Sequence, residues 1–214
     1  MALAHRQEAA DAPFPRALEF SSPSVEILRR HLQEPGKRQV LDLGAPSAAN
    51  VAFLNQVSCR LHLEDFYRFL MMDRRAREGE DAGGGEEREG VAAELERALA
   101  YPRNVRFDLV FGWDIYCYLE QPTFAALMAR VARSCRPGCL LYLVGSNLPR
   151  IPAAPARISI EPGNRVRYLA PGNGDSTSNP RYTPLALERM MPGFRLLHSF
   201  LLDEGIQEFI FSFG

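Results

Sequence analysis

Acidic residues and a glycine follow two short apolar runs, and their types suit a ligand rich in hydroxyl groups. Asp42 and Gly44 end the first run, and Glu64 with Asp65 follow the second. A carboxylate accepts hydrogen bonds from hydroxyls such as those of a ribose, and a glycine lets the backbone approach a ligand closely. In an open parallel sheet such ligands bind beyond the carboxyl ends of the strands. The pattern therefore predicts a nucleotide-like ligand at these two strand ends.

A second group of polar side chains follows a third apolar run. Asp114 comes first, with Tyr116 and Tyr118 after it. A carboxylate at this place could orient or deprotonate a hydroxyl or amine of a substrate. The alternative is structural: Asp114 caps the next loop and the tyrosines pack on it.

Composition and charge exclude several classes of protein. The 214 residues carry a formal charge of −1, and the pI of about 6.4 argues against a strongly basic nucleic-acid binder. The four cysteines form no C-x-x-C pair and the histidines are scattered, so we expect no metal site. Free cysteines in apolar surroundings suit a reducing compartment. The densest apolar stretch, 139–144, is far shorter than a membrane span. We therefore expect a cytoplasmic protein without membrane contact.

Strand and helix signals alternate through most of the chain, which predicts an α/β fold. The signals favour a mostly parallel sheet with right-handed crossovers, closed by an antiparallel strand pair, with an inserted hairpin. Strands are expected at 39–44, 59–63, 107–112, 139–145, 194–202 and 206–213, a hairpin at 157–160 and 166–169, and helices from 22, 47, 66, 91, 122 and 184.

Three segments depart from this regular alternation. Residues 1–21 are expected to form a flexible arm before a single domain over 22–214. Residues 78–89 hold six acidic residues and a run of three glycines, a composition that predicts a disordered loop. Residues 146–184 hold seven of the sixteen prolines, and we expect them to form a cover with the inserted hairpin. Such a long connection often serves as a binding loop or lid.

The order of these segments resembles the class I S-adenosylmethionine-dependent methyltransferases, whose fold is Rossmann-like. The resemblance rests on Val40-Leu41-Asp42-Leu43-Gly44, on Leu63-Glu64-Asp65 about twenty positions later, and on Phe107-Asp108-Leu109-Val110 followed by a helix and an apolar strand. The terminal antiparallel pair suits the family's last two strands. The family's third strand cannot be placed between residues 70 and 105.

The resemblance implies that S-adenosylmethionine is the cofactor. By alignment, Glu64 falls on the family's ribose-binding acid, with Asp65 beside it. The residues that the resemblance implies at the cofactor are Asp42, Gly44, Ala45, Pro46, Glu64, Asp65, Gly112 and Trp113. The loop after the first strand departs from the family, because only its first glycine is present and Pro46 donates no N–H. The departure implies a weakened site. A catalytically silent binding or scaffold protein is the alternative to a methyltransferase.

The acceptor is expected to be a small molecule rather than nucleic acid. The family's signatures for methylation of bases and ribose are missing here. Asp114 is the candidate catalytic residue, and Tyr116, Arg181 and Tyr182 are the candidate substrate contacts. Residues 146–184 are expected to lie over the cofactor end of the sheet as a lid. The alternative is a hairpin that only extends the edge of the sheet.

Overall fold

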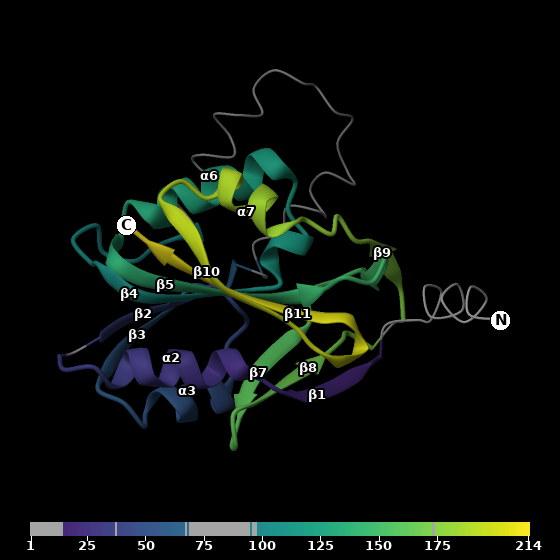
Figure 1. The fold of residues 1–214 in the computed structure, drawn as a ribbon, viewed down its shortest axis with the longest axis horizontal. Coiled ribbons are helices and arrows are strands. Elements are labelled where there is room, and N and C mark those ends of the chain that lie inside the picture. The colour runs from purple at the N-terminus through teal and green to yellow at the C-terminus, as the bar shows by residue number, and fades with distance from the viewer. Residues whose placement is uncertain (1–14, 37, 67, 69–94, 96–97, 173) are drawn as a thin grey trace.

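The computed structural model describes residues 15–36, 38–66, 68, 95, 98–172 and 174–214. Its centre is a six-stranded sheet in the order β10-β11-β5-β4-β2-β3. Helices α2 and α3 lie on one face of this sheet, and α6 and α7 lie on the other (Figure 1). The strands are β2 (Arg38–Asp42), β3 (Cys59–Leu63), β4 (Phe107–Trp113), β5 (Cys135–Ser146), β10 (Phe194–Leu201) and β11 (Ile206–Phe213); the helices are α2 (Pro23–Gln33), α3 (Ala48–Leu54), α6 (Gln121–Ala132) and α7 (Pro184–Met190).

The strand directions confirm the fold class predicted from the sequence. β3, β2, β4 and β5 are parallel neighbours, whereas β11 runs antiparallel to β5, and β10 antiparallel to β11. All seven residues of β4 are buried, as expected for a strand that is covered on both faces. The third strand of the resembling family has no counterpart among the described residues. The segment 69–94, including the acidic run 78–89, lies outside them.

Capping signals in the sequence match the observed helix starts. Ser22 caps α2, where its Oγ accepts a hydrogen bond from the N–H of Val25 at 3.2 Å. Ser47 caps α3 by accepting from the N–H of Asn50 at 3.5 Å. The apolar spacing of residues 51, 54 and 57 predicts a helix that ends at Val57, but α3 ends three residues earlier, at Leu54. Strand β5 begins at Cys135, four residues earlier than expected, because Cys135 already pairs with Phe107.

A smaller sheet lies beside the carboxyl end of the central strands. It has the order β1-β8-β7 and consists of β1 (Ala17–Ser21), β7 (Arg157–Glu161) and β8 (Arg165–Leu169). The hairpin predicted around Pro162–Asn164 is therefore present. The expectation of a flexible arm over residues 1–21 is wrong for Ala17–Ser21, which pairs antiparallel with β8. Glu19 supports this pairing through Arg165 at 2.7 Å and Arg167 at 3.2 Å. Residues 1–14 lie outside the described part of the chain.

A buried carboxylate ties α2 to the central sheet. The Glu208 side chain of β11 is fully buried, and its Oε1 accepts hydrogen bonds from Ser22 Oγ at 2.5 Å and from the Tyr142 hydroxyl at 2.6 Å. A buried charge needs such donors, because an unpaired one is strongly unfavourable. This network fixes the start of α2 against β5 and β11, on the face away from α6.

Candidate functional site

The crevice between β2 and β4 is the place where an open α/β sheet binds its ligands. The chain runs from β2 outward to β3 and then returns to β4 on the other side of β2. The strand order therefore reverses between β2 and β4, and such a switch point leaves a crevice at the carboxyl ends of the strands. In register, Asp42 pairs with Leu63 of β3 and Phe111 of β4. This alignment brings Gly44, Glu64 and Trp113 to one edge.

Trp113 spans this crevice. The β4–β5 register shifts between Phe111 and Trp113, and a bulge at this place re-aims the following side chain. Trp113 itself has a φ of +49°, a left-handed conformation that costs a non-glycine residue roughly 1–2 kcal/mol. Its indole stacks on Phe111 at 4.9 Å and is 1% exposed, and its Nε1 donates to Asp42 Oδ1 at 2.6 Å. The backbone of β4 is thus bent to place the indole against β2.

Gly44 is required by this indole. A Cβ on Gly44 would lie 2.5 Å from Cδ1 of Trp113 and 2.6 Å from its Nε1, and real Cβ atoms do not come this close. From the sequence, the glycine was expected to give a ligand access to the backbone. In this structure, the Trp113 ring makes the close approach instead. Gly112 is likewise fixed by packing, since a Cβ there would lie 2.5 Å from Leu143 Cδ2.

Asp42 is a buried carboxylate that is only half satisfied. Its Oδ1 accepts hydrogen bonds from Trp113 Nε1 and from the N–H of Gly44 at 2.9 Å, while its buried Oδ2 has no hydrogen-bond partner among the described residues. The Asn50 amide lies close enough to lower the pKa of Asp42 by hydrogen bonding, while its Nδ2 also donates to Ile158 O at 3.2 Å. Burial raises the pKa of Asp42 to about 6, although the Trp113 and Gly44 donors oppose the rise. A buried acceptor of this kind points to a ligand or an ion.

The other predicted cofactor residues surround this crevice. The Glu64 carboxylate is half-buried, and its Oε2 accepts from the N–H of Ala100 at 3.2 Å. Partial burial raises the pKa of Glu64, and the Ala100 N–H opposes the rise. Asp65 accepts from the N–H of Arg68 at 3.1 Å. Ala45 is half-buried and Pro46 exposed on the approach to α3.

The hairpin of the small sheet is anchored at the same edge by a residue that the sequence did not single out. Asn50, in the first turn of α3, donates to Ile158 O and accepts from the N–H of Ile160 at 2.8 Å. The Asn50 amide thus hydrogen-bonds to the peptide groups on both sides of Ser159, and these two bonds fix the position of β7 relative to α3. Nothing in the sequence signals this role, because an asparagine near a helix start is usually read as a capping residue.

Asp114 also contacts the hairpin. Its carboxylate is 1% exposed, and its Oδ2 accepts a hydrogen bond from the Tyr168 hydroxyl at 3.1 Å. Tyr168, in β8, is 3% exposed. The carboxylate therefore joins the end of β4 to the hairpin, a position that suits a structural role and leaves its predicted role as a base a proposal.

The role of Asp114 can be tested by its coupling to Tyr168. We expect Tyr168→Phe and Asp114→Asn each to lower the free energy of unfolding by about 1–3 kcal/mol, because each removes or weakens a buried hydrogen bond to a charged group. The double variant should cost less than the sum of the two, with a coupling of about 0.5–3 kcal/mol. Urea denaturation followed by circular dichroism measures these values. Additive effects would show that the hydrogen bond does not anchor the hairpin.

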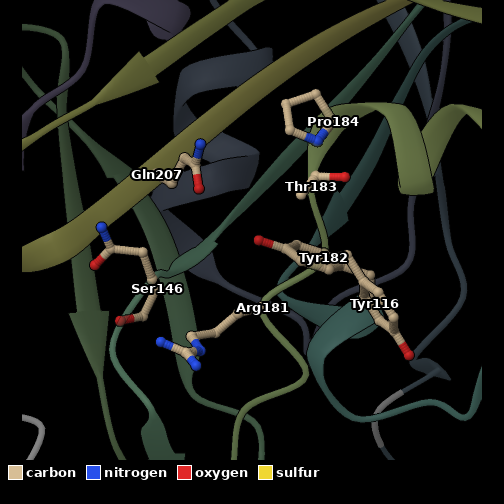
Figure 2. Close-up of a pocket in the computed structure, with 8 residues that line it drawn as sticks. Tyr116, Ser146, Arg181, Tyr182, Thr183, Pro184 and Gln207 are labelled. Carbon is tan, nitrogen blue, oxygen red and sulfur yellow. The ribbon is translucent and has the colours of Figure 1, made fainter.

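The three predicted substrate contacts come together in a second place. Tyr116, Arg181 and Tyr182 line one pocket at the carboxyl end of β5, beside α7 (Figure 2). Tyr116 belongs to the short 3-10 helix Ile115–Cys117, directly after Asp114. Ser146 and Gln207 also line the pocket, and the sequence analysis did not single them out. Segment 146–184 thus supplies both the hairpin anchored by Asn50 and a wall of this pocket, and its role as a cover stays a prediction.

The described part of the chain shows neither a metal-binding cluster nor a membrane-spanning helix. It contains no group of three or more His, Cys, Asp or Glu residues that could hold a metal ion. None of its helices combines the length and the hydropathy that crossing a membrane requires.

Solved structures that are similar to this chain include methyltransferases, at low sequence identity. The N1-methyltransferase of 1,6-didemethyltoxoflavin from Burkholderia thailandensis, solved with S-adenosylhomocysteine, is 15% identical with a TM-score of 0.49, over 99% of this chain and 80% of its own. The N-methyltransferase NodS from Bradyrhizobium japonicum, also with S-adenosylhomocysteine, is 14% identical with a TM-score of 0.45, over 99% and 97%. A protein from Pyrococcus horikoshii is 16% identical with a TM-score of 0.48, over 88% and 87%. No protein-family model and no curated sequence matches the chain.

Proposed function

We propose that this protein binds S-adenosylmethionine at the crevice between β2 and β4 and transfers its methyl group to a small-molecule acceptor. The observation that carries the proposal is the Asp42 carboxylate at the switch point of the sheet. No described residue makes a hydrogen bond within ordinary distance to its buried Oδ2, and burial raises the pKa of Asp42 to about 6. A protein gains no stability from a buried, half-satisfied carboxylate, so its presence at a ligand-binding edge supports a functional role.

The residues around the crevice fit the parts of this cofactor. Asp42 offers an acceptor to the cofactor's ammonium group, and Glu64 offers one to its ribose hydroxyls, with Asp65 beside it. Gly44, Ala45 and Pro46 border the crevice on the β2 side, and Gly112 and Trp113 border it on the β4 side. The bound cofactor supplies an electrophilic methyl group on a sulfonium, so the protein's task is to align the acceptor and exclude water.

The Trp113 indole limits how the cofactor can enter. The ring packs against Gly44, and its Nε1 donates a hydrogen bond to Oδ1 of Asp42. A ligand that takes the Gly44 side of the crevice must displace it, which lowers the apparent affinity by the fraction of molecules in the open state. The same packing favours the second candidate function, a catalytically silent binding protein in which the indole permanently replaces part of the ligand.

A fluorescence titration distinguishes the two candidates, because Trp113 is the single tryptophan of the chain. With S-adenosylhomocysteine, we expect a saturable shift of the emission to longer wavelength, as the indole leaves its buried contacts on Phe111 and Gly44 for water. Calorimetry under the same conditions should report heat with the same midpoint. A flat emission and no heat at millimolar ligand would reject the cofactor proposal and favour the silent protein.

The ribose contact is tested by Glu64→Gln. Losing a charged acceptor should weaken S-adenosylhomocysteine binding by about 10- to 100-fold, corresponding to about 1.5–3 kcal/mol. The matched control is Glu34→Gln, since Glu34 is an exposed residue after α2 whose partner is Arg38. If both variants bind like the wild type, Glu64 does not contact the ribose.

A further inference from the structure

The pocket at the end of β5 has the size and lining of a site for a small planar ligand. Its volume is about 170 Å³, and a cavity of about 150 Å³ is large enough to hold benzene. It opens between the end of β5, the start of β11 and the segment that leads into α7. The residues that line it are Tyr116, Ser146, Asn147, Arg181, Tyr182, Thr183, Pro184 and Gln207.

The charge of this pocket lining is positive and comes from one residue. Arg181 is the single charged side chain among the eight residues, and no carboxylate accompanies it. Two other arginines of segment 146–184 are engaged elsewhere: Arg150 donates to Ser176 Oγ, and Arg165 pairs with Glu19. No ion pair or side-chain hydrogen bond engages the Arg181 guanidinium within the described residues. Figure 2 shows Arg181, Tyr182 and Gln207 around one space, with the Tyr116 hydroxyl directed away from it.

The backbone of Arg181 is held in place by a neighbouring amide. Its φ is +47°, a conformation that a residue with a side chain keeps only where the surroundings enforce it. Asn179, which is 6% exposed, enforces it: its Oδ1 accepts from the N–H of Arg181 at 3.2 Å, and its Nδ2 donates to Ser146 O at 2.6 Å and Leu148 O at 2.8 Å. These bonds tie the loop that carries Arg181 to the end of β5. Buried Asn179 thus holds the backbone of Arg181, while the Arg181 side chain is exposed and lines the pocket.

We propose that this pocket binds a planar monocarboxylate of about the size of benzoate, with Arg181 on the carboxylate. A guanidinium forms two parallel hydrogen bonds with a carboxylate, and the Gln207 amide adds a neutral donor. Tyr116 and Tyr182 add aromatic surface to the lining, against which the ring of a planar ligand can pack. The lining holds no acid for an ammonium group and only one cation, so it suits neither an amine nor a phosphate ester with two negative charges. The inference rests on the proposed function, since it assigns the chemical class of the methyl acceptor.

Binding of three benzene derivatives tests this inference without the cofactor. Benzoate, benzamide and benzylammonium have nearly the same shape and differ in charge. In calorimetry or ligand-observed NMR with the full chain, we expect benzoate to bind more tightly than benzamide and benzylammonium not to bind. Equal binding of benzoate and benzamide, or no benzoate binding at tens of millimolar, would overturn the proposal.

Variants of Arg181 locate the binding in this pocket. Arg181→Gln should weaken benzoate by about 10-fold or more and leave benzamide unchanged, since a hydrogen bond to a charged group contributes about 1.5–3 kcal/mol. Arg181→Lys keeps the charge without the paired donors and should fall between wild type and Arg181→Gln. Arg189→Gln is the control, because Arg189 is exposed on α7 and is not part of the lining. Unchanged benzoate affinity in Arg181→Gln would overturn the assignment. The benzoate measurements are made without the cofactor. A negative benzoate result therefore does not contradict S-adenosylhomocysteine binding, and a negative S-adenosylhomocysteine result does not contradict benzoate binding.

Discussion

We expect Trp113→Ala to destabilise the protein more than any other substitution in the crevice. Removing a fully buried large aromatic side chain costs about 3–5 kcal/mol, and Trp113 is 1% exposed, stacked on Phe111 and edge-on to Tyr142 at 5.7 Å. The change also removes one of the two donors to Asp42 Oδ1. Urea denaturation followed by circular dichroism measures the loss. A change below about 1 kcal/mol would show that the indole is not packed between β2 and β4.

The Trp113→Ala variant also shows whether the Trp113 indole blocks the cofactor site or contacts the bound cofactor. If the indole occupies space that the cofactor requires, Trp113→Ala should bind S-adenosylhomocysteine at least as tightly as the wild type, in spite of its lower stability. A markedly weaker affinity, measured by calorimetry, would show that Trp113 is a contact of the ligand instead.

Gly44→Ala supplies the matched control for the packing argument. Its added Cβ collides with the indole, and overpacking of this kind costs about 1–3 kcal/mol. In the Trp113→Ala background the collision with the indole is absent and only the 3.2 Å approach to Asp42 Oδ1 remains, so the same substitution should cost less. An equal cost in both backgrounds would mean that the glycine is required for its backbone conformation.

Asp42→Asn should abolish a pH dependence of stability that this buried carboxyl imposes. Burial raises the folded pKa of Asp42 to about 6 from its usual value of 3.8. The folded state then binds the proton more tightly than the unfolded state, so the contribution to stability is most favourable below pH 4 and declines as the pH rises to 6. The decline amounts to about 3 kcal/mol, since one pKa unit corresponds to about 1.4 kcal/mol.

The measurement for Asp42 compares the free energies of unfolding of the wild type and of Asp42→Asn, each determined by denaturation at several pH values. Between pH 4 and pH 7, the stability of Asp42→Asn relative to the wild type should rise by about 2.5 kcal/mol, since the unfolded carboxyl is already more than half ionised at pH 4, while other titrating groups cancel. Asp203→Asn is the control, because Asp203 is an exposed carboxyl and is not among the groups that shift the pKa of Asp42. A constant difference across this range would mean that Asp42 titrates as an ordinary surface carboxyl.

The sequence by itself determined the elements of the fold. Continuous apolarity predicted β4 and β5, because a strand buried on both faces admits few polar residues. Ser22 and Ser47 marked two helix starts, and Pro162-Gly163-Asn164 marked the turn of a hairpin, since capping and turn geometry depend on adjacent residues. Alternation of helix and strand then favoured the parallel sheet. The strand ends with Asp42 and Glu64 were predictable for the same reason.

The contents of the crevice were decided by the tertiary structure. Trp113 reaches Asp42 across 71 positions of sequence, through a bulge and a left-handed backbone conformation that no local pattern announces. Asn50 holds a strand 108 positions away, and Asn179 fixes Arg181 by bonds to the end of β5, 31 to 33 positions earlier. The pairing of Ala17–Ser21 with β8 is likewise long-range. Local sequence constrains φ, ψ and burial pattern, whereas contacts between distant side chains depend on how the packed elements meet, and these contacts set the charge and access of both sites.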